Sequence, residues 1–176
     1  VELGGLTDNQ LEECLRLIDE AERPVIYAGG GVVSSHCEDS LLALAEKLQC
    51  PVTTTLMGIG AFPPAHELAM HALGMHGSKY ANIAVNEADL VLALGVRFDD
   101  RVTGNVSEFI CDGKIIHIDI DRDELNKNKT VTLPICANIQ ESLPQLVAAI
   151  KNREASEWNV YLQKMRADFP FSILDS

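Results

Sequence analysis

The stretch that decides the fold is Asp89-Leu90-Val91-Leu92-Ala93-Leu94-Gly95, an almost continuous run of apolar residues that ends in glycine. A strand has this composition when helices cover both faces of a parallel sheet, because neither face then needs polar side chains. The run Lys114–Asp121 (KIIHIDID) has the same character up to its two aspartates. Two such strands predict a parallel sheet buried between layers of helices.

Further strands and helices alternate outward from these two runs. Strands are expected over 24–28, 51–55 and 132–137. Three helix starts carry capping pairs: Thr7 with Gln10, Ser35 with Glu38, and Asn138 with Glu141. Pro144 lies inside the third of these helices and is expected to kink it or to delay its start. The alternation predicts an α/β fold: a doubly wound, mostly parallel Rossmann-like sheet of about six strands, with helices on both faces.

Composition and charge exclude several classes of partner. Of the 176 residues, 14 are basic and 26 acidic, which gives a formal net charge of −12. A chain this acidic repels phosphate backbones, so neither nucleic acid nor an anionic membrane is an expected partner. No apolar run approaches the roughly 20 residues that cross a bilayer, and the first residues lack the features of a signal peptide. Since there is also no initiating Met, the chain is expected to be cut from a longer protein.

The five cysteines are odd in number and form no CxxC pair. This usage favours buried thiols in a reducing compartment over a disulfide framework or a zinc knuckle, and predicts a cytoplasmic location. The composition turns polar after Lys151. We therefore expect a nucleotide-binding domain over residues 1–151 and a connector toward a further domain over 152–176. The connector has a helical pattern around Trp158, and packing of this segment back on the domain is the alternative.

Glycines follow the first strand and precede a helix, at Gly29-Gly30-Gly31. Such a turn can bring backbone amides to a pyrophosphate, although a glycine triplet is also often only a tight turn. The spacing is not G-x-G-x-x-G. The ribose-binding carboxylate expected about 20 residues downstream of that motif is missing, which disfavours ordinary NAD binding.

Charged residues follow the strongest strand, in the run Gly95-Val96-Arg97-Phe98-Asp99-Asp100-Arg101-Val102-Thr103-Gly104. Two arginines at a strand end can clamp a pyrophosphate, or can simply pair with the two aspartates in a solvated loop. Asp119 is a candidate for hydrogen bonding to a ribose, whereas Asp121 with Glu124 also fits a capping box.

Metal and catalytic motifs are not evident. His71 and His76 lack helical spacing and a companion carboxylate or thiol, so no metal site is predicted. No serine elbow, Walker pattern or supported Cys/His pair occurs. The residues alone indicate a binding domain without a catalyst.

Read in order, four segments resemble the acetohydroxyacid synthase (acetolactate synthase) family, in its large catalytic subunit. The segments are Thr53-Thr54-Thr55-Leu56-Met57-Gly58, Leu73-Gly74-Met75-His76-Gly77, the run 95–104, and His117-Ile118-Asp119-Ile120-Asp121. The similarity covers about residues 23–150, and residues 158–171 look like the linker to the family's third domain. The resemblance implies a central FAD-binding domain of an enzyme that uses thiamine diphosphate and magnesium, both held by other domains. That enzyme joins pyruvate to a second 2-keto acid with loss of carbon dioxide, in branched-chain amino acid synthesis.

The resemblance also implies site residues and partners. FAD would be contacted by Gly29, Gly30, Gly31, Thr55, Leu56, Met57, Leu73, Gly74, Met75, His76, Gly95, Arg97, Asp99, Arg101, Val102, Asp119 and Ile120. Asp100 and Arg101 would face the substrate and inhibitor channel. The implied partners are the enzyme's own N- and C-terminal domains, further copies in a homo-oligomer, and a regulatory small subunit.

The sequence departs from the family pattern at one position, and other functions remain as alternatives. Asn138 stands where the family usually has an aspartate near the adenine. The catalytic glutamate and the metal-binding motif belong to other domains, so no catalysis is expected from this chain alone. The alternatives are the central domain of a pyruvate oxidase or decarboxylase, a scaffold without ligand, and an NAD-dependent module.

Overall fold

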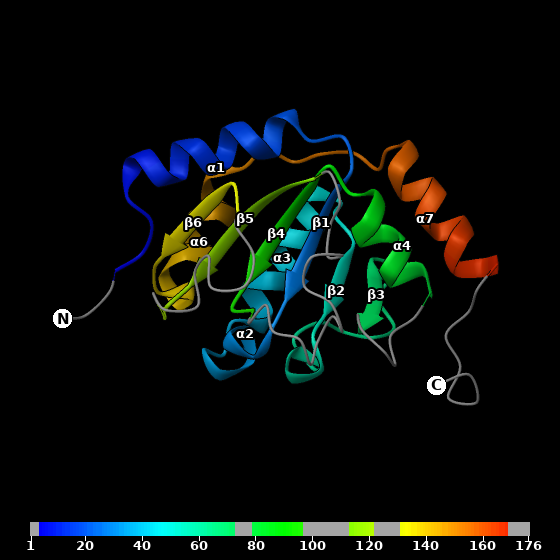
Figure 1. Ribbon diagram of the computed structural model, residues 1–176, viewed down its shortest axis with the longest axis horizontal. Helices are drawn as coiled ribbons and strands as arrows, with labels where there is room; N and C mark the ends of the chain where they lie inside the picture. Colours follow the sequence, from blue (N-terminus) through cyan, green and yellow to red (C-terminus); the bar gives the residue numbers. More distant parts are fainter. Residues whose placement is uncertain (1–3, 73–78, 97–112, 122–130, 169–176) are drawn as a thin grey trace.

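The computed structural model describes residues 4–72, 79–96, 113–121 and 131–168, and its centre is one parallel sheet (Figure 1). Six strands lie in the order β3-β2-β1-β4-β5-β6, and every pairing is parallel. Their bounds are β1 Pro24–Ala28, β2 Val52–Thr54, β3 Ala69–Ala72, β4 Leu90–Leu94, β5 Lys114–Asp119 and β6 Leu133–Cys136. The doubly wound fold is confirmed. The edge strand β3 had not been predicted.

The strand order reverses beside β1, because β2 and β3 are added on one side of β1 and β4, β5 and β6 on the other. β4 pairs with the other side of β1, with Ile26 opposite both Val52 and Leu92. Ligands of open parallel sheets bind at the carboxyl ends of the strands at such a switch point. That edge lies at the bottom of Figure 1, where α2 follows β1.

Helices cover both faces of the sheet, as predicted. Their bounds are α1 Asp8–Glu20, α2 Gly30–Ser34, α3 Glu38–Leu48, α4 Lys79–Glu87, α6 Ile139–Ala149 and α7 Glu157–Asp168, with a short 3-10 helix η1 at Leu56–Gly58. One apolar cluster joins α1, α2, α3 and α6 to the sheet, and a second joins α4 and α7 to it. Alternate strand residues face the two clusters; Ile26, for example, belongs to the first cluster and Tyr27 to the second.

Two of the three predicted helix starts are correct. Thr7 and Gln10 form a reciprocal capping box. The Asn138 side chain accepts from the Gln140 amide, but its own amide donates to Gly4 O, so Glu141 does not complete a box there. Pro144 lies inside α6 without delaying its start.

The predicted helix start at Ser35 is wrong. α2 begins earlier, at Gly30, and Ser35 ends it. The next residue, His36, has a left-handed backbone (φ 56°), which stops the helix, and α3 begins only at Glu38. Neither α2 nor α3 has a side-chain hydrogen bond at its N-cap, so the Ser35–Glu38 spacing is not used as a capping box.

The segment after Lys151 packs against the amino ends of the strands. Trp158 and Leu162 of α7 are buried in the second cluster, and Trp158 Nε1 donates to Pro24 O (3.0 Å). Four more side chains donate to backbone carbonyls: Arg153 to Ile18 and Ala21, Asn159 to Gln49, Gln163 to Glu67, and Arg166 to His66 and Glu67. The described part of the segment is thus packed on the sheet; its role as a connector stays a prediction.

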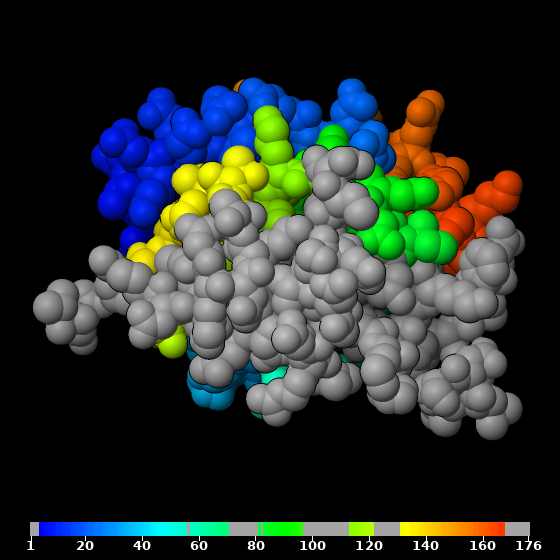
Figure 2. Space-filling model, viewed as in Figure 1, coloured from blue at the N-terminus to red at the C-terminus, as the bar shows by residue number. Residues whose placement is uncertain are grey.

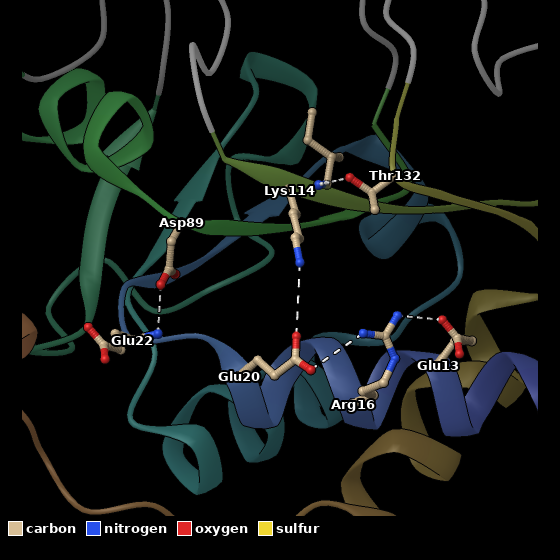
Figure 3. A network of polar contacts seen from close by, with 8 residues as sticks. Glu13, Arg16, Glu20, Glu22, Asp89, Lys114 and Thr132 are labelled. Carbon is tan, nitrogen blue, oxygen red and sulfur yellow. Dashed lines mark hydrogen bonds and ion pairs between the residues drawn. The ribbon is translucent and has the colours of Figure 1, made fainter.

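A polar network lies at the same amino edge (Figure 3). The Asp89 carboxylate accepts from the amides of Glu22 (2.7 Å) and Arg23 (2.8 Å), which holds the turn between α1 and β1. Glu20 pairs with Arg16 (3.4 Å) and more distantly with Lys114 (3.9 Å). The side chains of these exposed pairs are about half accessible, and such pairs contribute about 0–1 kcal/mol each. In Figure 2, α1 (blue) and α7 (orange to red) both reach the surface.

The buried thiols give a test of the packing. Cys14, Cys37 and Cys50 are buried, and Cys136 is partly exposed. Burial, with a smaller effect of Glu13, raises the pKa of the Cys14 thiol to about 12. Burial also raises the pKa of Cys50. Since the thiolate is the reactive form, both thiols stay protonated at pH 8, far below the raised pKa.

In the folded chain at pH 8, an aromatic disulfide reagent is expected to modify Cys136 well before Cys14 or Cys50, with peptide mapping to assign the sites. All five cysteines should react once the chain is unfolded in denaturant, which is the control. Modification of Cys14 as fast as Cys136 in the folded state would contradict the packing of α1 on the sheet.

Candidate functional site

Three glycines bring the ends of β1 and β4 together at the switch point. A Cβ atom on Gly29 would lie 2.4 Å from Gly95 O, and one on Gly31 would lie 2.7 Å from Gly95 Cα. Both distances are too short for a carbon, so only glycine fits at these positions without a shift of the backbone. Gly95 also has a left-handed backbone (φ +61°), which favours glycine by itself.

The amides of the glycine triplet are not all available to a ligand. Gly29 N donates to Leu94 O (2.9 Å), and Gly31 N donates to Gly95 O (3.1 Å). Gly30 is the first residue of α2, where an amide has no partner within its own helix. The close approach to Gly95 thus explains why positions 29 and 31 are glycine. Of the three backbone amides, that of Gly30 is the best placed for a pyrophosphate.

The end of β2 borders the same turn. Thr55 is buried; its amide donates to Ala28 O (3.0 Å) and its hydroxyl accepts from Gly58 N (3.0 Å). Leu56 and Met57 follow in η1. The Met57 side chain is 79% exposed, and its Cβ would be 3.1 Å from a Cβ on Gly30. The exposed apolar side chain of Met57 therefore lies beside Gly30.

The end of β5 carries a carboxylate on the neighbouring strand. Asp119 is buried, and its Oδ1 accepts from Asp121 N (2.8 Å). Ile120 is 57% exposed. The carboxylate of Asp119 therefore lies at the end of β5, beside the turn that leads to Asp121.

His117 was overlooked as a functional candidate. It is fully buried on β5, and its Nε2 lies 2.9 Å from Val96 O and 3.9 Å from Asp119 Oδ2. The signal available in the sequence was a histidine inside the apolar run 115–118, two residues before Asp119 and so on the same face.

The structure brings part of the predicted site together. Gly29, Gly30, Gly31, Thr55, Leu56, Met57 and Gly95 meet around the β1–β4 switch point, with Asp119 and Ile120 one strand away. Nine predicted residues lie outside the described ranges: Leu73, Gly74, Met75, His76, Arg97, Asp99, Asp100, Arg101 and Val102.

A hollow of about 660 Å³ lies at the opposite, amino edge of the sheet, and its lining includes Glu22, Arg23, Glu87, Arg153 and Trp158. Arg153 Nη1 and Nη2 donate to backbone carbonyls, and so does Arg23 Nε. The carboxyl edge is therefore the better candidate for an anionic nucleotide.

Within the described ranges, no group of three or more histidine, cysteine, aspartate or glutamate side chains is placed to hold a metal ion. No helix among those residues is both long and apolar enough to cross a membrane.

A parallel sheet of this order, with glycine turns at its switch point, defines the class of nucleotide-binding α/β domains. Residues 11–146 match the family described as "Thiamine pyrophosphate enzyme, central domain". That match covers well over half of the chain, so the chain belongs to this family.

Three relatives show which enzymes of this family the chain is similar to. The chain is 49% identical over 171 residues to the probable acetolactate synthase 2, chloroplastic, of Oryza sativa subsp. japonica, covering 92% of this chain and 26% of that protein. It is 46% identical over 166 residues to the acetolactate synthase large subunit of Corynebacterium glutamicum, with the same coverage. It is 47% identical over 156 residues to the probable acetolactate synthase large subunit of Methanocaldococcus jannaschii (89% and 26%). The chain spans about a quarter of the length of these curated relatives.

Proposed function

We propose that this chain is the FAD-binding central domain of an acetolactate synthase large subunit. The observation that carries the proposal is identity of 46–49% to acetolactate synthases of a plant, a bacterium and an archaeon, over about nine tenths of the chain. The alternative members of the same family, pyruvate oxidases and decarboxylases, are disfavoured by the run 95–104.

The residues at the carboxyl edge suit a dinucleotide. In the proposal, the Gly30 amide faces the pyrophosphate, and Arg97 pairs with the phosphate charge. The exposed side chains of Met57 and Ile120 offer apolar contact to ring systems, and Asp119 accepts from ribose hydroxyls. Gly29, Gly31 and Gly95 act indirectly, by letting the ends of β1 and β4 approach each other.

The activity belongs to the whole protein. In the proposal, the full-length enzyme condenses pyruvate with a second 2-keto acid, with loss of carbon dioxide, using thiamine diphosphate and Mg²⁺ held by domains outside this chain. Its partners are its own N- and C-terminal domains, further copies of itself and a regulatory small subunit, and its location is the cytoplasm.

The proposal is tested by titrating the chain with FAD and following flavin fluorescence. Saturable binding is expected, and Arg97→Ala is expected to weaken it about tenfold or more, because a charge-assisted contact to phosphate is worth about 1.5–3 kcal/mol. The matched control is Arg16→Ala, which removes an exposed arginine of α1 that pairs with Glu13 and Glu20. It should leave the affinity unchanged.

Three outcomes would count against the proposal. No binding up to millimolar FAD would exclude a flavin site held by this chain itself. Equal losses with Arg97→Ala and Arg16→Ala would mean that the arginine of the run 95–104 has no special role. Saturable binding of NAD instead of FAD would favour the NAD-dependent module.

A further inference from the structure

The side chain of His117 links the ends of two strands at the proposed site. Backbone pairing of β4 with β5 ends where Gly95 N donates to Ile118 O (2.9 Å). The chain then turns at Gly95, and the next carbonyl, that of Val96, lies 2.9 Å from His117 Nε2. The hydrogen bond of the imidazole therefore joins β5 to the residue that follows the last backbone hydrogen bond between β4 and β5.

The contact fixes the role of one imidazole nitrogen. A carbonyl only accepts hydrogen bonds, so Nε2 carries a proton and donates a hydrogen bond to Val96 O. Val96 is buried in the second cluster and His117 is fully buried, so a Val96 carbonyl without its donor would be costly. The same nitrogen lies 3.9 Å from Asp119 Oδ2, so one ring faces both the turn after β4 and the carboxylate of β5.

We infer that His117 is a positioning residue of the nucleotide site, which holds the Gly95–Val96 turn at a fixed distance from Asp119. The inference rests on the proposed function. In this inference His117 does not contact the ligand. It fixes the distance between the Gly95–Val96 turn and Asp119, which do. Loss of its donor is expected to weaken nucleotide binding even where the chain remains folded.

Two substitutions separate the donor from the bulk of the ring. His117→Gln can place an amide N–H close to the position of Nε2, whereas His117→Met fills similar volume without a donor. FAD and ADP affinities are measured for both, in buffer without denaturant, alongside circular dichroism to establish that each variant is folded. The control is His66→Met, which removes a histidine at the amino edge whose Nδ1 accepts from Leu68 N.

His117→Met is expected to weaken both FAD and ADP about tenfold, because a buried carbonyl loses its donor. His117→Gln should recover most of the affinity, and His66→Met should have none of this effect. A purely structural histidine would not give this order, because Gln and Met would then differ in stability but not in affinity.

A second measurement avoids mutation. In the unmodified chain, the Nε2–H signal of His117 is followed by NMR during titration with FAD, and it is expected to shift as Asp119 engages the ligand. An unmoved signal at saturation, or equal affinities of the unmodified chain and a folded His117→Met, would overturn the inference. If the unmodified chain does not bind FAD at all, the proposed function has failed instead.

Discussion

Replacing Trp158 by alanine is expected to lower the free energy of unfolding by about 3–5 kcal/mol, the usual range for deleting a buried aromatic side chain. Trp158 is 5% exposed in the second cluster, and its Nε1 donates to Pro24 O at the start of β1. The substitution removes the packing of α7 and leaves a buried carbonyl without its donor. Urea unfolding followed by far-UV circular dichroism measures the loss, since the chain has no other tryptophan to report by fluorescence.

Val160→Ala is the matched control on the same helix, because that side chain is 68% exposed. It should change the free energy of unfolding by less than about 0.5 kcal/mol. Trp158→Phe is expected to fall between the two, since it keeps an aromatic ring but loses the hydrogen bond. If Trp158→Ala were as mild as Val160→Ala, the packing of α7 would contribute little to the stability of the domain.

Gly95→Ala is expected to destabilise the chain and to weaken FAD binding at the same time. Its Cβ would lie 2.7 Å from Gly31 Cα and 3.0 Å from Ile139 Cδ1, in a backbone conformation that side chains rarely adopt. Overpacking of this kind costs about 1–3 kcal/mol, and the left-handed backbone adds about 1–2 kcal/mol. The turn after β4 must then move, which displaces the edge where the nucleotide is proposed to bind. Urea unfolding and FAD titration give the two quantities.

Gly60→Ala separates the two causes. Gly60 also has a positive φ (+101°), but a Cβ there would meet nothing within 4 Å. Its cost therefore measures backbone strain alone, and FAD affinity should be unchanged. If Gly95→Ala cost no more than Gly60→Ala, the close approach of β1 and β4 would not be a constraint on this fold.

The sequence predicted the sheet well because its central strands are buried on both faces. β4 and β5 have long apolar runs, and such runs leave little choice of structure. β3 was missed because Ala69–Ala72 is short and contains His71, so it lacks both length and an apolar pattern. The start at Ser35 was wrong because the Ser–Glu spacing favours a capping box that does not form: α2 already ends at Ser34, and α3 begins at Glu38 without a side-chain cap.

The site was predicted only in outline from the residues themselves. Glycines and aspartates at strand ends pointed to the correct edge, because parallel strands present their carboxyl ends together. The sequence could not show that Gly29 and Gly31 are glycines on account of Gly95, since that contact joins residues more than 60 positions apart. Likewise, a histidine within a strand gives no sign of reaching a carbonyl on the neighbouring strand until the register of β4 and β5 is known.

The hydrogen bonds between the last segment and the amino edge have an evolutionary consequence. In the side-chain hydrogen bonds of this contact, the donors belong to residues 153–166 and the acceptors are main-chain carbonyls. A main-chain carbonyl is present whatever residue carries it. Positions such as Ile18 and Gln49 can therefore drift without losing these bonds, while a single mutation of Arg153, Asn159 or Arg166 removes its own. Selection on these bonds therefore acts on the side chains of residues 153–166 and not on those of the acceptor residues. The sequence of the amino edge can diverge while the donors are retained.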